Sequence, residues 1–400
     1  MRANGNPRAA RRPWHVATVT GRLGASTRGS RAAREAAVFD KITVLESFSP
    51  RGPTTNPYLT QLLACGSTDI SIEPFSWKQA IVGHYDVLHL HWPEFLLRGP
   101  GRLRAVLRWL GFVSLMTRLT VTGAGLVRTL HNLEPHEPGH WPERVLIEWC
   151  ERRTTAWIRL TPETVPPTDA PVHTILHGDY VTWFAAQAVP TTKPGHLLYF
   201  GLIRPYKGVE LLMDAFSETD DPDLSLHVVG KPHGSALTDR IHAACATDPR
   251  IGARLGYCDD AELAWEIGCA ELVVLPYRQM HNSGSVLLAL SLGRPVLVPL
   301  NEVNKALADE VGPGWVHTFI GVLRPDDLTS TLIQVRAGTR TESPDLSRRT
   351  WEAVGLQHRE VFRESILERR RSLWQPRAHH ALSAGSGSTG NQVPGCGVAG

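Results

Sequence analysis

Two cations stand in a short loop between a strand pattern and a helix pattern. The segment Phe200–Gly208 reads FGLIRPYKG and contains Arg204 and Lys207. Gly201 favours a tight turn after the apolar strand, and Gly208 opens the helix. An arginine can bridge two phosphate oxygens and a lysine supplies a point charge, so the pair could neutralise a leaving diphosphate. Two solvated loop cations are the alternative, and the strand–loop–helix setting favours the phosphate role.

A second turn of small polar residues leads into an apolar helical pattern further along the chain. Backbone N–H groups at such a helix start attract anions, although serine and asparagine there are equally suited to capping the helix. The strand before this turn ends at Tyr277, which places both turns at the carboxyl edge of one sheet. The candidate diphosphate-binding residues are therefore Arg204, Lys207, Gly208, Tyr277, Asn282, Ser283, Gly284 and Ser285.

Histidines and acids follow two strand patterns in the first half of the chain. His131 directly ends an apolar strand, and Glu134 lies in the loop that follows it. Glu94 comes just after a neighbouring strand that ends at His91. A cleft that needs a general base uses such side chains, so His131, Glu94 and Glu134 are the catalytic candidates. Surface or helix-capping roles are the alternative for the two glutamates.

Some of these side chains could instead bind a metal. The two sets with suitable ligand atoms are His91 with Glu94, and His131 with Glu134 and His136. A proline stands between the last two residues of the second set and breaks any helical spacing. We therefore expect no metal ligands and no cofactor.

Short strands alternate with helices along the chain, which is typical of a doubly wound α/β fold. The strands expected in the first half are Lys41–Phe48, Tyr85–His91, Leu126–His131, Ala156–Leu160 and Val172–Leu176. Those expected in the second half are Leu197–Phe200, Leu224–Val229, Arg250–Leu255, Leu272–Leu275 and Pro295–Pro299. The expected helices are Leu59–Cys65, Leu103–Leu119, Glu143–Thr155, Val209–Phe216, Ser235–Ala246, Asp260–Ile267, Ser285–Leu292, Asn304–Asp309 and Leu346–Leu373.

The pattern predicts two Rossmann-like domains that face a cleft. Residues 41–190 form the first, and residues 195–345 form the second, which carries the candidate diphosphate-binding residues; a Pro/Gly-containing linker joins them. The helix over residues 346–373 is expected to cross back to the first domain. Residues 1–40, rich in arginine, and residues 379–400, rich in glycine and serine, are expected to be disordered.

Composition excludes several classes of protein. The chain has 400 residues and a formal net charge of +3, which is too small to indicate nucleic-acid binding. Its six cysteines are scattered without a CxxC pair, as expected of reduced cysteines in a cytoplasmic protein. No apolar run is long enough to span a membrane. The arginine-rich helix Leu103–Leu119 either packs within the first domain or rests on an anionic membrane surface, through Trp109, Phe112, Leu115 and Met116.

Over residues 41–372 the chain resembles the GT-B fold glycosyltransferases, most of all the family 4 group. FGLIRPYKGVELLMDAF resembles the donor-diphosphate segment of that family, and SGSVLLALSLGRPVLVP its signature helix and following strand. RTLHNLEPHE resembles the strand end whose histidine contacts the donor sugar, which implies that role for His131. The resemblance implies a nucleotide diphosphate sugar as donor, bound by the second domain, residues 195–345, and a glycan or glycolipid as acceptor, on the side of the first domain, residues 41–190.

The chain departs from the family pattern at its paired glutamates. Met280 and Leu288 stand where that pattern has acids, so the ribose contact would be lost or remade by Asn282 or Ser283. The loop after the first strand, RGPTTNPY, is also atypical. The pattern is also similar to bacterial β-mannosyltransferases that use GDP-mannose and extend a glycolipid, which would be inverting enzymes with a base on the first domain.

We therefore expect a metal-independent glycosyltransferase of the cytoplasm, with GDP-mannose as the favoured donor and contact with the inner membrane face as an open alternative. A sugar-nucleotide epimerase or hydrolase would use the same donor site. A non-catalytic paralogue that only binds the nucleotide is the alternative that the missing glutamates favour.

Overall fold

The computed structural model describes residues 41–50, 56–131, 140–278, 280, 283–338 and 340–374, with side chains up to residue 369. The two candidate site residues Glu134 and Asn282 lie outside the described residues, as do both expected disordered ends and most of the atypical loop after the first strand.

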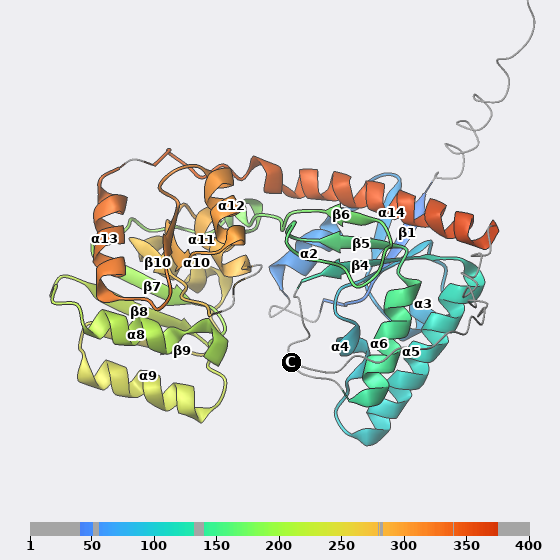
Figure 1. The fold of residues 1–400 in the computed structure, drawn as a ribbon, viewed down its shortest axis with the longest axis horizontal. Helices are drawn as coiled ribbons and strands as arrows, with labels where there is room; N and C mark the ends of the chain where they lie inside the picture. The colour runs from blue at the N-terminus through green and yellow to red at the C-terminus, as the bar shows by residue number, and fades with distance from the viewer. Residues whose placement is uncertain are drawn as a thin grey trace, which may run out of the picture. The chain divides into compact units, whose positions relative to one another are not determined.

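Two separate six-stranded parallel sheets form the described chain, and they confirm the predicted α/β class with two Rossmann-like sheets. The first sheet has the order β2-β1-β3-β4-β5-β6, and the second β12-β11-β10-β7-β8-β9 (Figure 1). The first contains β1 Ile42–Glu46, β2 Ile70–Glu73, β3 Val87–Leu90, β4 Gly125–Leu130, β5 Ala156–Arg159 and β6 Val172–Thr174. The second contains β7 His196–Phe200, β8 Ser225–Gly230, β9 Ile251–Leu255, β10 Leu272–Val274, β11 Val296–Pro299 and β12 Val316–Phe319.

Helices connect the strands, as the parallel pairing requires. Those of the first half are α2 Pro57–Ala64, α3 Trp77–Val82, α4 Pro93–Leu97, α5 Arg102–Thr122, α6 Trp141–Arg153 and α7 Val181–Phe184. Those of the second are α8 Val209–Ser217, α9 Ser235–Thr247, α10 Asp260–Cys269, α11 Gly284–Ser291, α12 Glu302–Val311, α13 Pro325–Arg336 and α14 Trp351–Trp374. Each of the ten expected strands is present, with its ends shifted by a residue or two.

The sequence missed the two edge strands β2 and β12. Each is only four residues long and pairs with a single neighbour, β1 or β11. The segments ISIE and VHTF mix polar and apolar residues because one edge of each strand is open. The predicted start of the last helix at Leu346 was also wrong, since a 3₁₀ turn, Ser347–Arg349, precedes α14.

The side chains of β3 show how the first sheet is covered on both faces. Leu88 and Leu90 pack into the core that contains Phe112 of α5. His89 points to the opposite face, where its ring centroid lies 5.3 Å from that of Phe362 in α14. Alternate residues of a strand face opposite sides, so α5 and α14 lie on opposite faces of this sheet (Figure 1).

Helix α5 therefore packs within the first half of the chain. Phe112, Leu115 and Met116 are buried in its core, and Trp109 packs partly against it. Of the two alternatives for this helix, the structure supports packing within the domain for Phe112, Leu115 and Met116, because their burial against the sheet leaves them almost no exposed surface. A different row of apolar side chains is exposed on this helix, as described below.

Two glycines bring the ends of β7 and β8 into direct backbone contact. Gly230 has a φ of 145°, and a Cβ there would lie 1.9 Å from the carbonyl oxygen of Gly201. Any side chain at Gly230 would therefore displace the turn that begins at Gly201. That turn leads into the loop that carries Arg204 and Lys207, so this close approach fixes where the loop starts.

Candidate active site

Four residues from three segments converge at the carboxyl ends of β7 and β10. The Lys207 ammonium lies 4.7 Å from the centroid of the Tyr277 ring. The Tyr277 hydroxyl and the Ser285 Oγ are 3.3 Å apart. A Cβ on Gly201 would lie 3.3 Å from Ser285 Oγ and 3.9 Å from Lys207 Nζ, so all four share one small space. We name Gly201, Lys207, Tyr277 and Ser285 the phosphate-facing group, because a cation, a hydroxyl and an open backbone meet there.

Gly208 allows the cation loop to approach the second sheet closely. It has the left-handed φ of 64°, and a Cβ would lie 2.4 Å from the carbonyl oxygen of Pro276. Glycine is therefore required at this position, because any side chain would push the loop away from Pro276. Arg204 is half-buried and comes just before the 3₁₀ turn Pro205–Lys207, and no contact within the described part of the chain holds its guanidinium.

The polar turn before α11 has divided roles. Ser283 is the N-cap residue, and its Oγ accepts a hydrogen bond from the backbone N–H of Val286 at 3.3 Å. The capping alternative for Ser283 is therefore what the structure supports. Gly284 lets the helix start approach the first half of the chain, since a Cβ would lie 2.9 Å from the Tyr180 hydroxyl. Ser285 belongs to the phosphate-facing group.

A hydrogen-bonded chain of side chains crosses the ends of β1, β3 and β4. One carboxylate oxygen of Glu46 lies 3.0 Å from Nε2 of His91. The Nδ1 atom of His91 lies 2.8 Å from Nε2 of His131. We name Glu46, His91 and His131 the relay. The second Glu46 oxygen lies 2.9 Å from Nδ1 of His89, whose Nε2 lies 2.8 Å from the hydroxyl of Thr129.

The relay fixes the proton positions. Burial raises the pKa of Glu46, but His89 and His91 lower it more, to about 2, so the group is a carboxylate. Burial and the neighbouring His89 lower the pKa of His91 to about 4, against the opposing effect of Glu46. A neutral His91 that donates from Nε2 to Glu46 must accept at Nδ1, so His131 donates from its own Nε2. The Nδ1 atom of His131 then carries a lone pair.

Aromatic rings hold His131 in place. Trp92 stacks on its ring at 4.1 Å between centroids, and Tyr58 meets it edge-on at 5.5 Å. Burial and the neighbouring His91 lower the pKa of His131 well below its ordinary value, which leaves the imidazole neutral at pH 7. Glu94 of α4 is also buried and shares with His131 the lining of a cavity of about 180 Å³.

The sequence did not single out Glu46 or His89. A signal was present, because Glu46 is the one acid in a strand that is otherwise apolar apart from Thr43. His89 and His91 also stand two residues apart, which places them on one face of the strand end. What the sequence lacks is the pairing of β1 with β3, which sets Glu46 opposite His89.

Of the two metal-ligand sets considered from the sequence, the second includes Glu134 and His136, which lie outside the described residues. In the first set, the ring of His91 contacts Glu46 through Nε2. Three ligand-type atoms, from Glu46, His89 and His91, lie within 4.8 Å of one another. Both ring nitrogens of both histidines already have hydrogen-bond partners, and so do both carboxylate oxygens. Hydrogen bonding thus accounts for every ligand-type atom of this cluster.

The residues that replace the paired glutamates are packed in the second half of the chain. Met280 and Leu288 are 7% and 8% exposed. The Met280 sulfur lies 3.2 Å from Nδ2 of Asn304, and its carbonyl oxygen accepts from Asn301. Neither position offers a carboxylate to a ribose.

Comparison with known proteins shows the family to which this chain belongs. Residues 194–334 match the model of "Glycosyl transferases group 1". Two curated relatives from Xanthomonas campestris pv. campestris, both named GDP-mannose:glycolipid 4-beta-D-mannosyltransferase, are each 47% identical over 344 residues. The match covers 85% of this chain and 97% of each relative.

Solved structures show the same fold at low sequence identity. Anabaena Alr3699/HepE in complex with UDP has a TM-score of 0.53 and 14% identity, and the match covers 84% of this chain and 98% of that one. Sucrose-phosphate synthase from Thermosynechococcus elongatus has a TM-score of 0.51 and 13% identity, with the same two coverages. The chain is a GT-B glycosyltransferase and belongs to the family of the GDP-mannose:glycolipid 4-beta-D-mannosyltransferases.

Proposed function

We propose that this glycosyltransferase moves a mannosyl unit from GDP-mannose to a glycolipid and forms a β linkage. The names of the relatives, at 47% identity, support the donor, the acceptor class and the linkage. The sugar of GDP-mannose is α-linked, so a β product requires inversion at the anomeric carbon. An inverting reaction in one step needs a base for the acceptor hydroxyl and a stabiliser for the leaving GDP.

The observation that carries the proposal is the convergence of the phosphate-facing group. Lys207 and Ser285 lie beside the open backbone of Gly201, at the sheet edge where ligands of α/β proteins bind. Lys207 would stabilise the charge that develops on the diphosphate as the bond to the sugar breaks. Arg204 stands in the same loop and supplies a second cation. With both cations in place, the mechanism needs no metal or other cofactor.

His131 is the base that the geometry favours. In the transfer step the acceptor oxygen bonds to the anomeric carbon, its proton passes to Nδ1 of His131, and the bond to the phosphate breaks with both electrons on GDP. The imidazolium that forms is linked through His91 to the Glu46 carboxylate, which stabilises the new charge. Glu94, which lines the same cavity, is the second candidate. Glu134, in the loop after β4, stays a candidate on the sequence alone.

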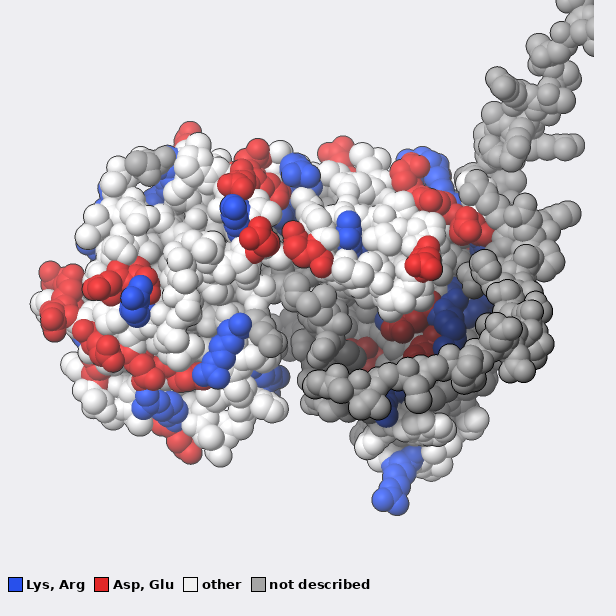
Figure 2. Space-filling view, in the orientation of Figure 1, with Lys and Arg blue, Asp and Glu red and all other residues white. Residues whose placement is uncertain are grey.

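An exposed apolar row on α5 supports a contact with the membrane surface. Leu103, Val106, Leu107, Leu110 and Val113 repeat at helical spacing and are 38–74% exposed. Arg102 and Arg104 are exposed beside them. Within the described residues no helix is long and apolar enough to cross a bilayer. The tip of the molecule below α5 in Figure 1 shows basic but no acidic side chains in the same view in Figure 2.

We infer that α5 rests on the cytoplasmic face of a membrane that carries the glycolipid. Arg108 is not part of this contact, because its guanidinium donates to the carbonyl oxygen of Phe95 at 2.9 Å. Arg118 likewise packs over the ring of Tyr85. The apolar row and the exposed Arg102 and Arg104 match the acyl and anionic headgroup layers of a bilayer.

A screen of sugar nucleotides tests the proposed donor. GDP-mannose should raise the melting temperature more than UDP-glucose or ADP-glucose does, since only a bound ligand stabilises the native state. With a bacterial glycolipid extract it should also yield a mannosylated product, whose linkage NMR would show to be β. Stabilisation by UDP sugars alone contradicts the donor assignment. Binding of GDP-mannose without transfer of mannose would instead favour a non-catalytic paralogue. Release of free mannose from GDP-mannose in the absence of an acceptor would favour a hydrolase.

Lys207→Ala tests the role of the phosphate-facing group. We expect kcat/KM for GDP-mannose to fall by a factor that corresponds to about 2–4 kcal/mol of barrier, because one charge stabiliser is lost. Lys78→Ala, at an exposed position on α3, is the matched control and should leave the rate unchanged. Near-normal turnover of Lys207→Ala would show that the leaving group is stabilised elsewhere. All assays contain EDTA, and a wild-type rate that needs added Mg²⁺ would contradict the metal-independent mechanism.

Glu46→Gln tests the relay. The amide cannot accept from both imidazoles or balance an imidazolium, so we expect kcat to fall about 100-fold with little change in the KM for GDP-mannose. The stability contributed by the Glu46 carboxylate is present above about pH 4.5 and is lost as the pH falls toward its folded pKa of about 2. The rates are therefore measured from pH 6 to 8.

Thr129→Val is the control for the relay, since it removes a buried hydrogen bond to His89 but leaves Glu46, His91 and His131 connected. Its kcat should fall far less than that of Glu46→Gln. Two results would show that the relay serves packing alone. One is an equal fall in kcat in the two variants, and the other is a Glu46→Gln variant that loses thermal stability but keeps its kcat.

A double substitution, Leu107→Glu with Leu110→Glu, tests the membrane contact. It should abolish co-sedimentation with vesicles that contain phosphatidylglycerol, because two carboxylates replace the centre of the apolar row. Ile333→Glu, at an exposed apolar position of α13, is the control and should still sediment. A wild-type protein that stays in the supernatant at low salt would contradict the contact.

A further inference from the structure

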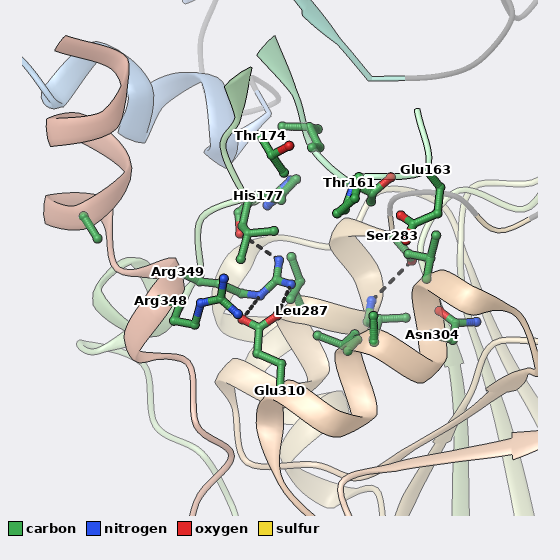
Figure 3. Close-up of a pocket in the computed structure, with 18 of the residues that line it drawn as sticks. Thr161, Glu163, Thr174, His177, Ser283, Leu287, Asn304, Glu310, Arg348 and Arg349 are labelled. Carbon is green, nitrogen blue, oxygen red and sulfur yellow. Dashed lines mark hydrogen bonds and ion pairs between the residues drawn. The ribbon is translucent and has the colours of Figure 1, made fainter. Parts of the chain in front are cut away.

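A cavity of about 500 Å³ lies beside the start of α11, and no step of the mechanism above uses it (Figure 3). Ser283 and Asn304 lie on one side of it, and Arg348, Arg349 and Glu310 on the other (Figure 3). Its walls come from the loop after β5, the segment after β6, and helices α11, α12 and α14. It is much larger than the cavity at His131.

The cavity combines an apolar wall with side chains that both donate and accept hydrogen bonds. Val286, Leu287 and Leu307 supply the apolar surface, and each is buried. Thr161, Asn304 and Gln357 are among its hydroxyl and amide side chains. A sugar ring presents apolar C–H faces and a rim of hydroxyl groups, which such a lining matches.

The charges of the lining cancel. Arg349 pairs with Glu310 through two contacts of 2.9 and 2.7 Å, and it also donates to the carbonyl oxygen of His177 at 3.3 Å (Figure 3). Arg348 and Glu163 are the other charged residues, with opposite signs. A phosphate or another anion would need net positive charge. The balance favours an uncharged ligand.

His177 presents a hydrogen-bond acceptor next to α11. Its Nδ1 donates to the carbonyl oxygen of Gly178 at 2.8 Å, which leaves Nε2 as the acceptor. Burial lowers the pKa of His177 to about 4, so the ring is neutral at pH 7. A Cβ on Gly284 would lie 3.7 Å from that Nε2 atom. The imidazole can therefore accept a hydrogen bond from a sugar hydroxyl where the cavity meets the start of α11.

The start of α11 joins this cavity to the phosphate-facing group. Ser283 lines the cavity, and Ser285, one residue beyond Gly284, faces Lys207 and Gly201. A donor held at its diphosphate would thus have its sugar close to the mouth of the cavity. Ala353 and Gln357 of α14 also line the cavity.

We propose that this cavity binds an uncharged sugar unit of the acceptor glycan, and this rests on the proposed function. The apolar wall holds a face of the sugar ring, while Thr161, His177 and Gln357 bind its hydroxyl groups. The bound unit anchors the glycan so that its reacting hydroxyl meets the donor sugar beside α11. The cavity selects against a charged unit because its own charges are already paired.

Ala306→Trp tests the proposal, because Ala306 is exposed on α12 and lines the cavity. The indole should fill the space and raise the KM for the glycolipid acceptor about tenfold or more. The Kd for GDP-mannose, measured by calorimetry, should change less than about twofold, since the phosphate-facing group is untouched. Ala246→Trp, at an exposed position of α9 outside the cavity, is the matched control.

Two further experiments test the same proposal. The first is a variant that does not fill the cavity, and the second is a binding measurement that does not require turnover. Gln357→Leu keeps the size of the side chain and removes its hydrogen bonds, and it should raise the acceptor KM in the same direction. Saturation-transfer NMR should detect methyl α-D-mannopyranoside or methyl β-D-glucopyranoside on the wild type and lose that signal in Ala306→Trp. Sodium pyrophosphate should not compete for this signal.

Several results would overturn the proposal. An unchanged acceptor KM in both cavity variants would do so. A fall in the affinity of these variants for GDP-mannose as large as the rise in the acceptor KM would also do so, because it would assign the cavity to the donor. Displacement of the glycoside signal by pyrophosphate would show an anion site. These failures differ from failure of the proposed function, in which the wild type itself transfers no mannose from GDP-mannose.

Discussion

The fully buried carboxylate of Glu46 is the interaction on which the first half of the site depends. A carboxylate without water is costly unless each oxygen is paired, and here His89 and His91 pair one oxygen each. This pairing decides which nitrogen of His91 carries a proton and, through His91, which nitrogen of His131 does. Substitution of this one residue of β1 would thus leave buried imidazoles unpaired and shift the ring of His131 at the end of β4.

The second half of the site depends on backbone geometry. Gly201 and Gly230 touch through their backbones, and Gly208 passes within contact of Pro276. These approaches set the path of the loop that carries Lys207, so its ammonium lies over the Tyr277 ring, and among the described residues no ion pair holds it. In the first half, a buried carboxylate therefore positions the neutral imidazole of His131, and in the second half, glycines without side chains set the position of the Lys207 ammonium.

The paired glutamates of related enzymes are replaced here by buried side chains that pack. Met280 contacts Asn304, and Leu288 faces the core. The helix that begins at Gly284 keeps its turn and its cap, so the fold does not depend on those acids. Beside the same helix lies the cavity that ends at Arg349 and Glu310. The start of this helix thus adjoins both the phosphate-facing group and that cavity.

The sequence by itself determined the alternating α/β pattern, the loop with Arg204 and Lys207, and His131 at the end of a strand, because strand periodicity and glycine turns are local properties. The short edge strands β2 and β12 escaped it, since one-sided pairing leaves a weak pattern. Only the tertiary structure decided that Glu46 faces His89 and His91, that Ser283 caps a helix while Ser285 faces Lys207, and that α5 exposes Leu103 and Leu107 instead of Phe112. Those outcomes depend on strand order, on register and on which helix face meets the sheet, and residues far apart in the chain set them together.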